Sequence, residues 1–136
     1  MTGLVYVDTS VVLAALLAED RRPPTDFWRG HLISSRLLQY ETWNRLHAAE
    51  SPGDVTDAAR FLIGSTDLVE MTPRVLARAL EPFPVRVRTL DGLHLATADH
   101  LREQGMRLTI ATYDARLAAA ARAMKFVVVE PGLETP

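Results

Sequence analysis

Two acidic residues stand at the ends of apolar runs, where the sequence predicts that they meet. Asp8 follows the run Leu4–Val7. Asp114 lies just beyond the run Leu108–Ala111. Such runs are typical of buried strands, and parallel strands bring their carboxyl ends to one edge of a sheet, where ligands bind. We therefore expect the two carboxylates to lie together. Asp114 can also simply cap the helix after it, whereas the hydroxyl residues after Asp8 can cap theirs and leave its carboxylate free.

Two further acidic residues, Asp91 and Glu41, lie within predicted helices on faces that are otherwise apolar. Asp91 begins the helix Leu90–Gln104 and has Leu95 four positions on, so its side chain is expected to be partly buried. A carboxylate placed there needs a cation or hydrogen bonds. Simpler roles remain open, because Asp91 can complement the helix dipole and Glu41 can form a surface ion pair with Arg45.

Carboxylates that gather at one edge of a sheet repel one another, which raises their pKa values unless a cation binds. Donor sets made only of oxygen select hard divalent ions such as Mg²⁺ or Mn²⁺. These ions bridge phosphates and activate water for in-line attack on phosphorus. The sequence therefore predicts a catalytic metal site formed by the four acidic residues, Asp8, Glu41, Asp91 and Asp114.

The elements that must position these residues alternate along the chain. The predicted strands are Leu4–Val7, His31–Ser34, Asp67–Glu70, Leu108–Ala111 and Phe126–Val129. The predicted helices are Val11–Ala18, Thr25–Arg29, a helix capped by Ser34 or Ser35 that runs to Ala49, a helix capped by Thr56 that runs to Ile63, a helix that begins at Pro73, Leu90–Gln104 and Ala115–Met124. Strands and helices that alternate with short connections predict an α/β fold of three layers, with a mostly parallel central sheet and helices on both faces. We expect one domain over residues 1–136, with a mobile tail from about 131 to 136.

Composition narrows the class of protein. The chain has 136 residues, of which 48% are hydrophobic and 24% charged, which is a globular balance. The net charge of −2 argues against binding of nucleic acid by bulk charge. The absence of cysteine excludes disulfides and thiolate chemistry and fits a reducing compartment. We find no apolar run long enough to cross a membrane and no signal peptide, so we expect a cytoplasmic protein that does not associate with a membrane.

The four acidic residues stand in motifs that resemble those of the PIN-domain family, and more closely of the VapC-type toxins of bacterial toxin–antitoxin pairs. The resemblance spans almost the whole chain. Its most specific part is the nine-residue stretch that contains Asp91, together with the later Thr-Tyr-Asp. The motifs are Val7–Ser10, Glu41–Asn44, Leu90–Ala98 and Thr112–Leu117.

The resemblance implies a function and a set of partners. The three near-invariant aspartates of the family correspond to Asp8, Asp91 and Asp114, and its helical acid corresponds to Glu41. It implies an endoribonuclease that depends on Mg²⁺ or Mn²⁺. It also implies a homodimer and a small cognate antitoxin protein whose tail occupies the active-site groove. All four acidic positions are filled, so the sequence gives no sign of an inactive site.

Residues near the acids have predicted supporting roles. Ser10 can contact a metal-bound water or cap a helix, and we favour the cap together with a contact to a metal ligand. Thr112 can orient Asp114 through its hydroxyl. Asn44 can bind RNA or Glu41, or remain in solvent. The basic pair Arg86 and Arg88 can hold flanking RNA phosphates, or form a solvated face.

Other residues have predicted roles in packing and association. His94 is expected to be packed rather than to bind a metal. The aromatic residues Trp28 and Trp43 are expected to pack in the core or at an interface with a partner, rather than to stack on bases. Helix positions such as Trp43, Leu46, Phe61 and Leu62 suggest more apolar surface than one small core needs, which favours a two-fold dimer.

Two alternatives remain open from the residues alone. The first is a phosphatase of the haloacid-dehalogenase type, which also begins with an aspartate at a strand end. Such enzymes carry a second aspartate two residues on, where this chain has Ser10, and a lysine late in the fold, for which Lys125 is the candidate. The second is a binding module that has kept the fold without catalysis, for which the loss of an acidic residue would be the sign.

Overall fold

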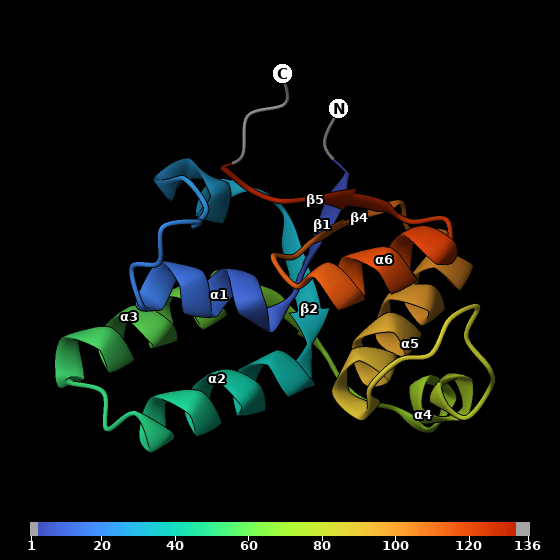
Figure 1. The fold of residues 1–136 in the computed structure, drawn as a ribbon, viewed down its shortest axis with the longest axis horizontal. Coiled ribbons are helices and arrows are strands. Elements are labelled where there is room, and N and C mark those ends of the chain that lie inside the picture. The colour runs from blue at the N-terminus through green and yellow to red at the C-terminus, as the bar shows by residue number, and fades with distance from the viewer. Residues whose placement is uncertain (1–2, 133–136) are drawn as a thin grey trace.

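A sheet of five parallel strands forms the centre of the computed structural model, which describes residues 3–132 (Figure 1). The strand order is β3-β2-β1-β4-β5. The strands are β1 (Leu4–Val7), β2 (Leu32–Ser35), β3 (Asp67–Val69), β4 (Leu108–Ala111) and β5 (Val127–Val129). The predicted α/β class is confirmed, and every pair of neighbouring strands is parallel.

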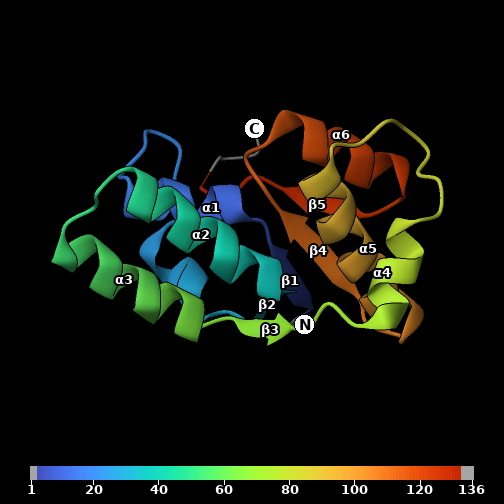
Figure 2. The same ribbon diagram turned by 90° about the horizontal axis from the view of Figure 1, so that it is seen from below.

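Helices cover both faces of this sheet. They are α1 (Thr9–Leu16), the short 3-10 helix η1 (Thr25–Arg29), α2 (Arg36–Ala48), α3 (Gly53–Gly64), α4 (Pro73–Ala79), α5 (Thr89–Glu103) and α6 (Ala115–Ala123). Figures 1 and 2 show α1, α2 and α3 on one side of the sheet and α4, α5 and α6 on the other. The chain moves outward from β1 to β3 in one direction and from β4 to β5 in the other, and right-handed crossovers then place the two sets of helices on opposite faces.

The core follows the two-residue alternation of the strands. Tyr6 and Ile110 lie opposite each other in the sheet and belong to the buried cluster formed with α5 and α6. Val7 and Ala111, one residue further along, belong to the cluster formed with α1, α2 and α3. Each central strand therefore contributes to two cores. This packing fixes the register of β1 and β4, and with it the positions of their carboxyl ends.

Several helix ends agree with their sequence signals. The Ser35 hydroxyl accepts a hydrogen bond from the backbone N–H of Leu37 (3.0 Å), and Thr72 caps the helix that begins with proline. Gly105 has a φ of 91°, as expected for a glycine that ends a helix. The predicted start of α3 was wrong, because this helix begins at Gly53 and the Thr56 hydroxyl donates to a carbonyl within its first turn.

Residues predicted to face a partner are largely part of the core. Trp28 and Trp43 pack against the cluster beneath α1 and α3, and Leu46 and Leu62 are buried. The expectation that Trp43, Leu46 and Leu62 are surplus to the core was wrong, because α2 and α3 both pack against α1. Phe61 differs from them and is 69% exposed.

The C-terminal segment leaves β5 through a turn at Pro131 and Gly132. Pro131 is buried, and its carbonyl accepts a hydrogen bond from the Tyr113 hydroxyl. Gly132 has a φ of 84°, and a Cβ there would lie 2.6 Å from the carbonyl oxygen of Arg22. The remainder of the predicted mobile tail, residues 133–136, lies outside the described residues. Within residues 3–132, no helix has the length and apolar character needed to cross a membrane.

An ion-pair cluster joins α4 to α5. The carboxylate of Asp99 on α5 accepts from Arg78 Nε at 2.6 Å and from Arg102 Nη2 at 2.8 Å, and its side chain is only 13% exposed. Burial alone would raise the pKa of Asp99, but the two guanidinium groups outweigh this effect and hold the pKa below its usual range. Arg78 also lies over the ring of Phe83 (4.6 Å to the centroid), so the cluster anchors the loop after α4.

Asp99→Asn is therefore expected to lower the free energy of unfolding at pH 7 by about 1–2 kcal/mol. Because the pKa of Asp99 is lower in the folded than in the unfolded protein, its contribution is complete above the unfolded pKa of about 3.9 and is lost as the pH falls through the folded pKa. Urea unfolding at pH 7 and below pH 3.5 measures both effects. As a control, Asp57→Asn removes an exposed pair with Arg60 and should change little. An equal loss in the two variants at pH 7 would refute this account.

Candidate active site

The four predicted acidic residues line one cavity at the carboxyl edge of the sheet. The chain leaves β1 toward one side of the sheet and β4 toward the other, so this edge is the topological switch point at which α/β proteins bind ligands. The cavity has a volume of about 570 Å³. Its acidic lining residues are Asp8, Glu41, Asp91 and Asp114.

Asp8 directly follows β1 and is 6% exposed. One of its oxygens, Oδ2, accepts from the Ser10 hydroxyl (2.6 Å), the Thr112 hydroxyl (2.8 Å) and the backbone N–H of Ser10. The expectation that hydroxyl residues cap α1 and leave Asp8 free was wrong, because Asp8 is itself the N-cap. Within the described chain, Oδ1 accepts no hydrogen bond, so one oxygen is fixed in place while the other remains available to a ligand.

Two hydroxyl groups connect the ends of β1 and β4. The Ser10 hydroxyl accepts from the backbone N–H of Tyr113 (3.0 Å), and the Thr112 hydroxyl accepts from the backbone N–H of Asp114 (3.0 Å). Thr112 thus orients Asp114 through its hydroxyl, as predicted, by way of the Asp114 backbone, and it also binds the carboxylate of Asp8. The Asp114 carboxylate caps α6, with Oδ1 accepting from two backbone N–H groups.

Arg88 lies between the carboxylates of Asp91 and Asp114. Its Nε donates to Asp91 Oδ2 at 3.3 Å, and its Nη2 donates to Asp114 Oδ2 at 3.1 Å. Burial raises the pKa of Asp91, and the negative charges of Asp114 and Asp8 raise it further, so Arg88 only partly offsets these effects. The carboxylate of Asp91 is therefore repelled by its acidic neighbours, and the guanidinium group of Arg88 does not fully offset this repulsion.

Glu41 is held by side chains from two other helices, α1 and α5. Its Oε1 accepts from the Thr9 hydroxyl (2.8 Å) and from His94 Nε2 (2.6 Å). His94 is buried, as predicted for a packed residue, and its Nδ1 lies 2.8 Å from the Tyr6 hydroxyl. The suggested surface pair with Arg45 is not among the ion pairs of residues 3–132, because Glu41 faces inward. The sequence held one indication of the contact between His94 and Glu41, because His94 lies one turn after Asp91 on the same helix and so faces the same site.

The pKa of His94 reflects this surrounding charge. Burial alone would lower its pKa, but the hydrogen bond to Glu41 and the negative charges of Asp8 and Asp91 raise it above its ordinary value. His94 therefore acts as a donor that fixes one oxygen of Glu41 and leaves the other oxygen, Oε2, without a partner among the described residues.

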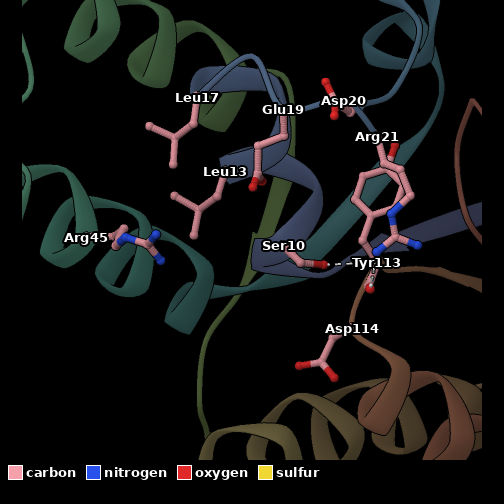
Figure 3. A pocket seen from close by; sticks show the side chains of 9 residues that line it. All are labelled: Ser10, Leu13, Leu17, Glu19, Asp20, Arg21, Arg45, Tyr113 and Asp114. Atoms are coloured by element: carbon pink, nitrogen blue, oxygen red, sulfur yellow. Dashed lines mark hydrogen bonds between the residues drawn. The ribbon is translucent and has the colours of Figure 1, made fainter.

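Basic side chains lie on both sides of the acid cavity. A second cavity of about 660 Å³ shares Ser10 and Asp114 with it (Figure 3). Figure 3 shows Arg45 of α2 across this cavity from Asp114, with Tyr113 and Arg21 at its far side. Arg45 lines both cavities, and we find no side-chain partner for it within the described residues.

A third cavity, of about 520 Å³, lies against Asp91 on the other side of the acid cavity. Its basic lining residues are Arg86, Arg88 and Arg116. Asn44 lines the acid cavity itself, and its side chain makes no hydrogen bond to residues 3–132. The structure therefore places the predicted supporting residues at or next to the acids.

The donor chemistry of the acid cavity fits a hard divalent cation. All the gathered groups are carboxylates, and three of them keep one oxygen without a hydrogen-bond partner in the described chain: Asp8, Asp91 and Glu41. Among residues 3–132, no three acidic or histidine side chains already have the spacing of a metal site. Arg88 bridges two of the carboxylates, so it must give way before an ion can lie between them.

The geometry also bears on the phosphatase alternative. Lys125 lies in the turn between α6 and β5, at the amino end of β5. Because the strands are parallel, this is the opposite edge of the sheet from the acids. Lys125 therefore takes no part in the site. At position 10, where a phosphatase of this type would carry its second aspartate, Ser10 donates a hydrogen bond to Asp8.

Thr112→Val tests the connection between the two strands. Thr112 is fully buried, and loss of its hydroxyl leaves the backbone N–H of Asp114 without this partner and removes one of the three hydrogen bonds to Asp8 Oδ2. We expect the free energy of unfolding to fall by about 1–3 kcal/mol. Thr42→Val is the matched control, because Thr42 is equally buried and its hydroxyl has no partner within the described residues. Urea unfolding should show Thr42→Val to be neutral or stabilising, and equal losses in both variants would contradict this role of Thr112.

Comparison with known proteins agrees with this geometry. A family model described as "PIN domain" matches residues 5–123. Ribonuclease VapC46 of Mycobacterium tuberculosis is 32% identical over 133 residues, which cover 93% of this chain and 97% of the relative. Ribonuclease VapC47 of the same organism is 27% identical and covers 95% of this chain and 98% of its own length.

Two solved structures share the fold. The crystal structure of Mycobacterium tuberculosis VapC20, described as a sarcin-ricin loop cleaving toxin, has a TM-score of 0.67 and 21% identity, and the match covers 93% of this chain and 99% of that one. The structure of PAE2754 from Pyrobaculum aerophilum has a TM-score of 0.61 and 23% identity, with 95% and 92% covered. At these identities the two structures support the fold alone.

Proposed function

We propose that this chain, which belongs to the PIN-domain family, is a metal-dependent endoribonuclease that acts in the cytoplasm as the toxin of a toxin–antitoxin pair. The observation that carries the proposal is the convergence of four carboxylates, from β1, α2, α5 and the end of β4, on one cavity. The relatives that carry the name ribonuclease align over nearly their whole length, which supports RNA as the substrate. All four acidic residues are present, whereas a binding module without catalysis would be expected to have lost one of them.

Each acidic residue has a distinct part in this proposal. Asp8, Asp91 and Asp114 hold a divalent cation, Mg²⁺ or Mn²⁺. When bound, such an ion lowers the pKa of water and stabilises the charge that develops on phosphorus during in-line attack. Glu41 either holds a second ion or orients the attacking water. Its Oε1 is fixed by Thr9 and His94, which leaves Oε2 for that work.

Side chains around the acids position the substrate. Ser10 and Thr112 hold Asp8 in one orientation, so its free oxygen keeps a constant position as RNA enters. Arg86 and Arg116 line the adjoining cavity and are suited to hold the phosphates that flank the cleaved bond. Attack by water on the phosphodiester leaves a 5′-phosphate on one product and a 3′-hydroxyl on the other.

Cleavage of a mixed RNA pool is expected with Mg²⁺ or Mn²⁺ and is expected to stop in EDTA. Asp8→Asn keeps the shape of the side chain and removes its charge, so it should lower the rate by at least about 100-fold while the protein stays folded. Asp91→Asn should behave alike, and Glu41→Gln should be milder if its ion is the second one. Asp57→Asn, an exposed acid far from the cavity, is the control. Equal cleavage in EDTA, or 2′,3′-cyclic phosphate ends, would refute this mechanism, because that chemistry uses the ribose hydroxyl instead.

We also propose two protein partners. A small antitoxin with a basic segment would complement the acid cavity, and a second copy of this chain would cover the exposed side chains of Phe61 on α3 and Tyr40 on α2. Co-expression with the neighbouring gene should yield a stable, inactive complex, and light scattering of the purified chain should give twice 15.1 kDa. A chain that is harmless to cells when it is expressed without a partner would argue against the antitoxin. A species of 15.1 kDa alone at micromolar concentration would argue against the dimer.

A further inference from the structure

We propose that Arg88 is an exchangeable counter-ion of the acid cluster. Without a divalent cation its guanidinium group pairs with Asp91 and Asp114, and entry of the cation releases it to bind a phosphate of the RNA. This inference rests on the proposed function, because it assumes that the acids take up a metal. It assigns Arg88 two alternative partners, one for each state of the site.

The backbone of Arg88 is held firmly at the start of α5. Its carbonyl accepts from the backbone N–H of Gly92 at 2.8 Å, which closes the first turn of the helix. The loop before α5 packs closely on Gly92, since a Cβ at this position would lie 3.3 Å from Val87 and 3.6 Å from Phe83. Phe83 is in turn covered by Arg78. The loop therefore presents Arg88 at a constant position, and only its side chain needs to move.

The contacts of this side chain suit a pair that can be exchanged. The Arg88 side chain is 58% exposed, and its two hydrogen bonds are relatively long, at 3.3 and 3.1 Å. The pair between Arg78 and Asp99 provides a contrast within the same molecule, with a distance of 2.6 Å and an arginine side chain that is 19% exposed. Asp91 is only 15% exposed, so it is the exposed guanidinium group and the long hydrogen bonds that keep these pairs weak. A doubly charged ion that binds the same carboxylates can therefore displace the guanidinium group.

The charges also favour exchange. Asp8, Asp91 and Asp114 line one cavity with a single bridging guanidinium group. One positive charge leaves the three carboxylates in excess, whereas a divalent ion brings two charges to the same oxygens. Both Asp91 and Asp114 use their Oδ2 atoms for Arg88, so the guanidinium group and an ion that bridges these two residues compete for the same space.

The released side chain has a place to go. The cavity that Arg88 shares with Arg86 and Arg116 lies directly beside Asp91. Neither Arg86 nor Arg116 has a side-chain partner within residues 3–132. Three guanidinium groups around one cavity are suited to a phosphate, which accepts paired hydrogen bonds from each. Binding of the metal would thus complete the phosphate site next to it, so the two ligands would bind cooperatively.

The test measures metal binding without RNA. Mn²⁺ is titrated by calorimetry into the wild-type chain, Arg88→Gln and Arg86→Gln. Loss of Arg88 should tighten the Kd for Mn²⁺ by about three- to tenfold, because the ion no longer has to break its ion pairs. Arg86→Gln removes the same charge from the same loop without touching a carboxylate. This control reports the general effect of charge, which should be smaller than the effect of Arg88→Gln.

A second readout follows Arg88 directly. In a ¹⁵N-edited NMR spectrum, the Nε–H signal that is lost in Arg88→Gln should shift on addition of Mg²⁺, whereas the Arg86 signal should not. Equal Mn²⁺ affinities in the two variants, or an Arg88 signal that ignores Mg²⁺, would overturn the exchange while leaving the proposed nuclease intact. If neither the wild-type chain nor Arg88→Gln binds Mn²⁺, the metal dependence itself fails. If Arg88→Gln tightens Mn²⁺ binding in a chain that cleaves no RNA, the exchange stands and the nuclease does not.

Discussion

The rest of the site depends on the hydrogen bonds that the carboxylate of Asp8 accepts. Asp8 directly follows β1, caps α1 and accepts hydrogen bonds from two hydroxyl groups, one of which lies beyond the end of β4. The hydroxyl groups of Ser10 and Thr112 that donate to Asp8 also accept from backbone N–H groups, and they thereby fix the segment that carries Asp114. A buried carboxylate is costly unless its oxygens are hydrogen-bonded. One oxygen of Asp8 meets this need within the protein, so the other can remain open at the cavity without unfolding the strand end.

The position of the acids could be predicted because it depends on the topology of the backbone. Asp8 and Asp114 follow apolar runs whose period and length indicate buried strands, and parallel strands place their ends at one edge. Asp91 was placed correctly for a similar reason, since its helix had clear apolar spacing and a glycine stop. These inferences need only the direction of each strand and helix, and not the conformation of any side chain.

The partners of the acids could not be predicted, because they depend on side chains that meet across different elements. Glu41 contacts Thr9 and His94 rather than Arg45, which lies four residues on along its own helix. Spacing along one helix favours the local pair, but burial of the inward face decides in favour of the distant one. The cap of α1 was missed for a related reason, since Asp8, Thr9 and Ser10 are all good capping residues and only the packed structure selects among them.

The arginine content of the chain gains a physical meaning at this site. Lys125 is the only lysine among the 15 lysine and arginine residues. At position 88, however, a planar guanidinium group with several donors bridges two carboxylates at once, which a single ammonium group does less well. The same group can bind two oxygens of a phosphate. A residue that must serve carboxylates in one state and a phosphate in another is thus better built from arginine, and a chain with a net charge of −2 can bind RNA through a few such groups placed beside its acids.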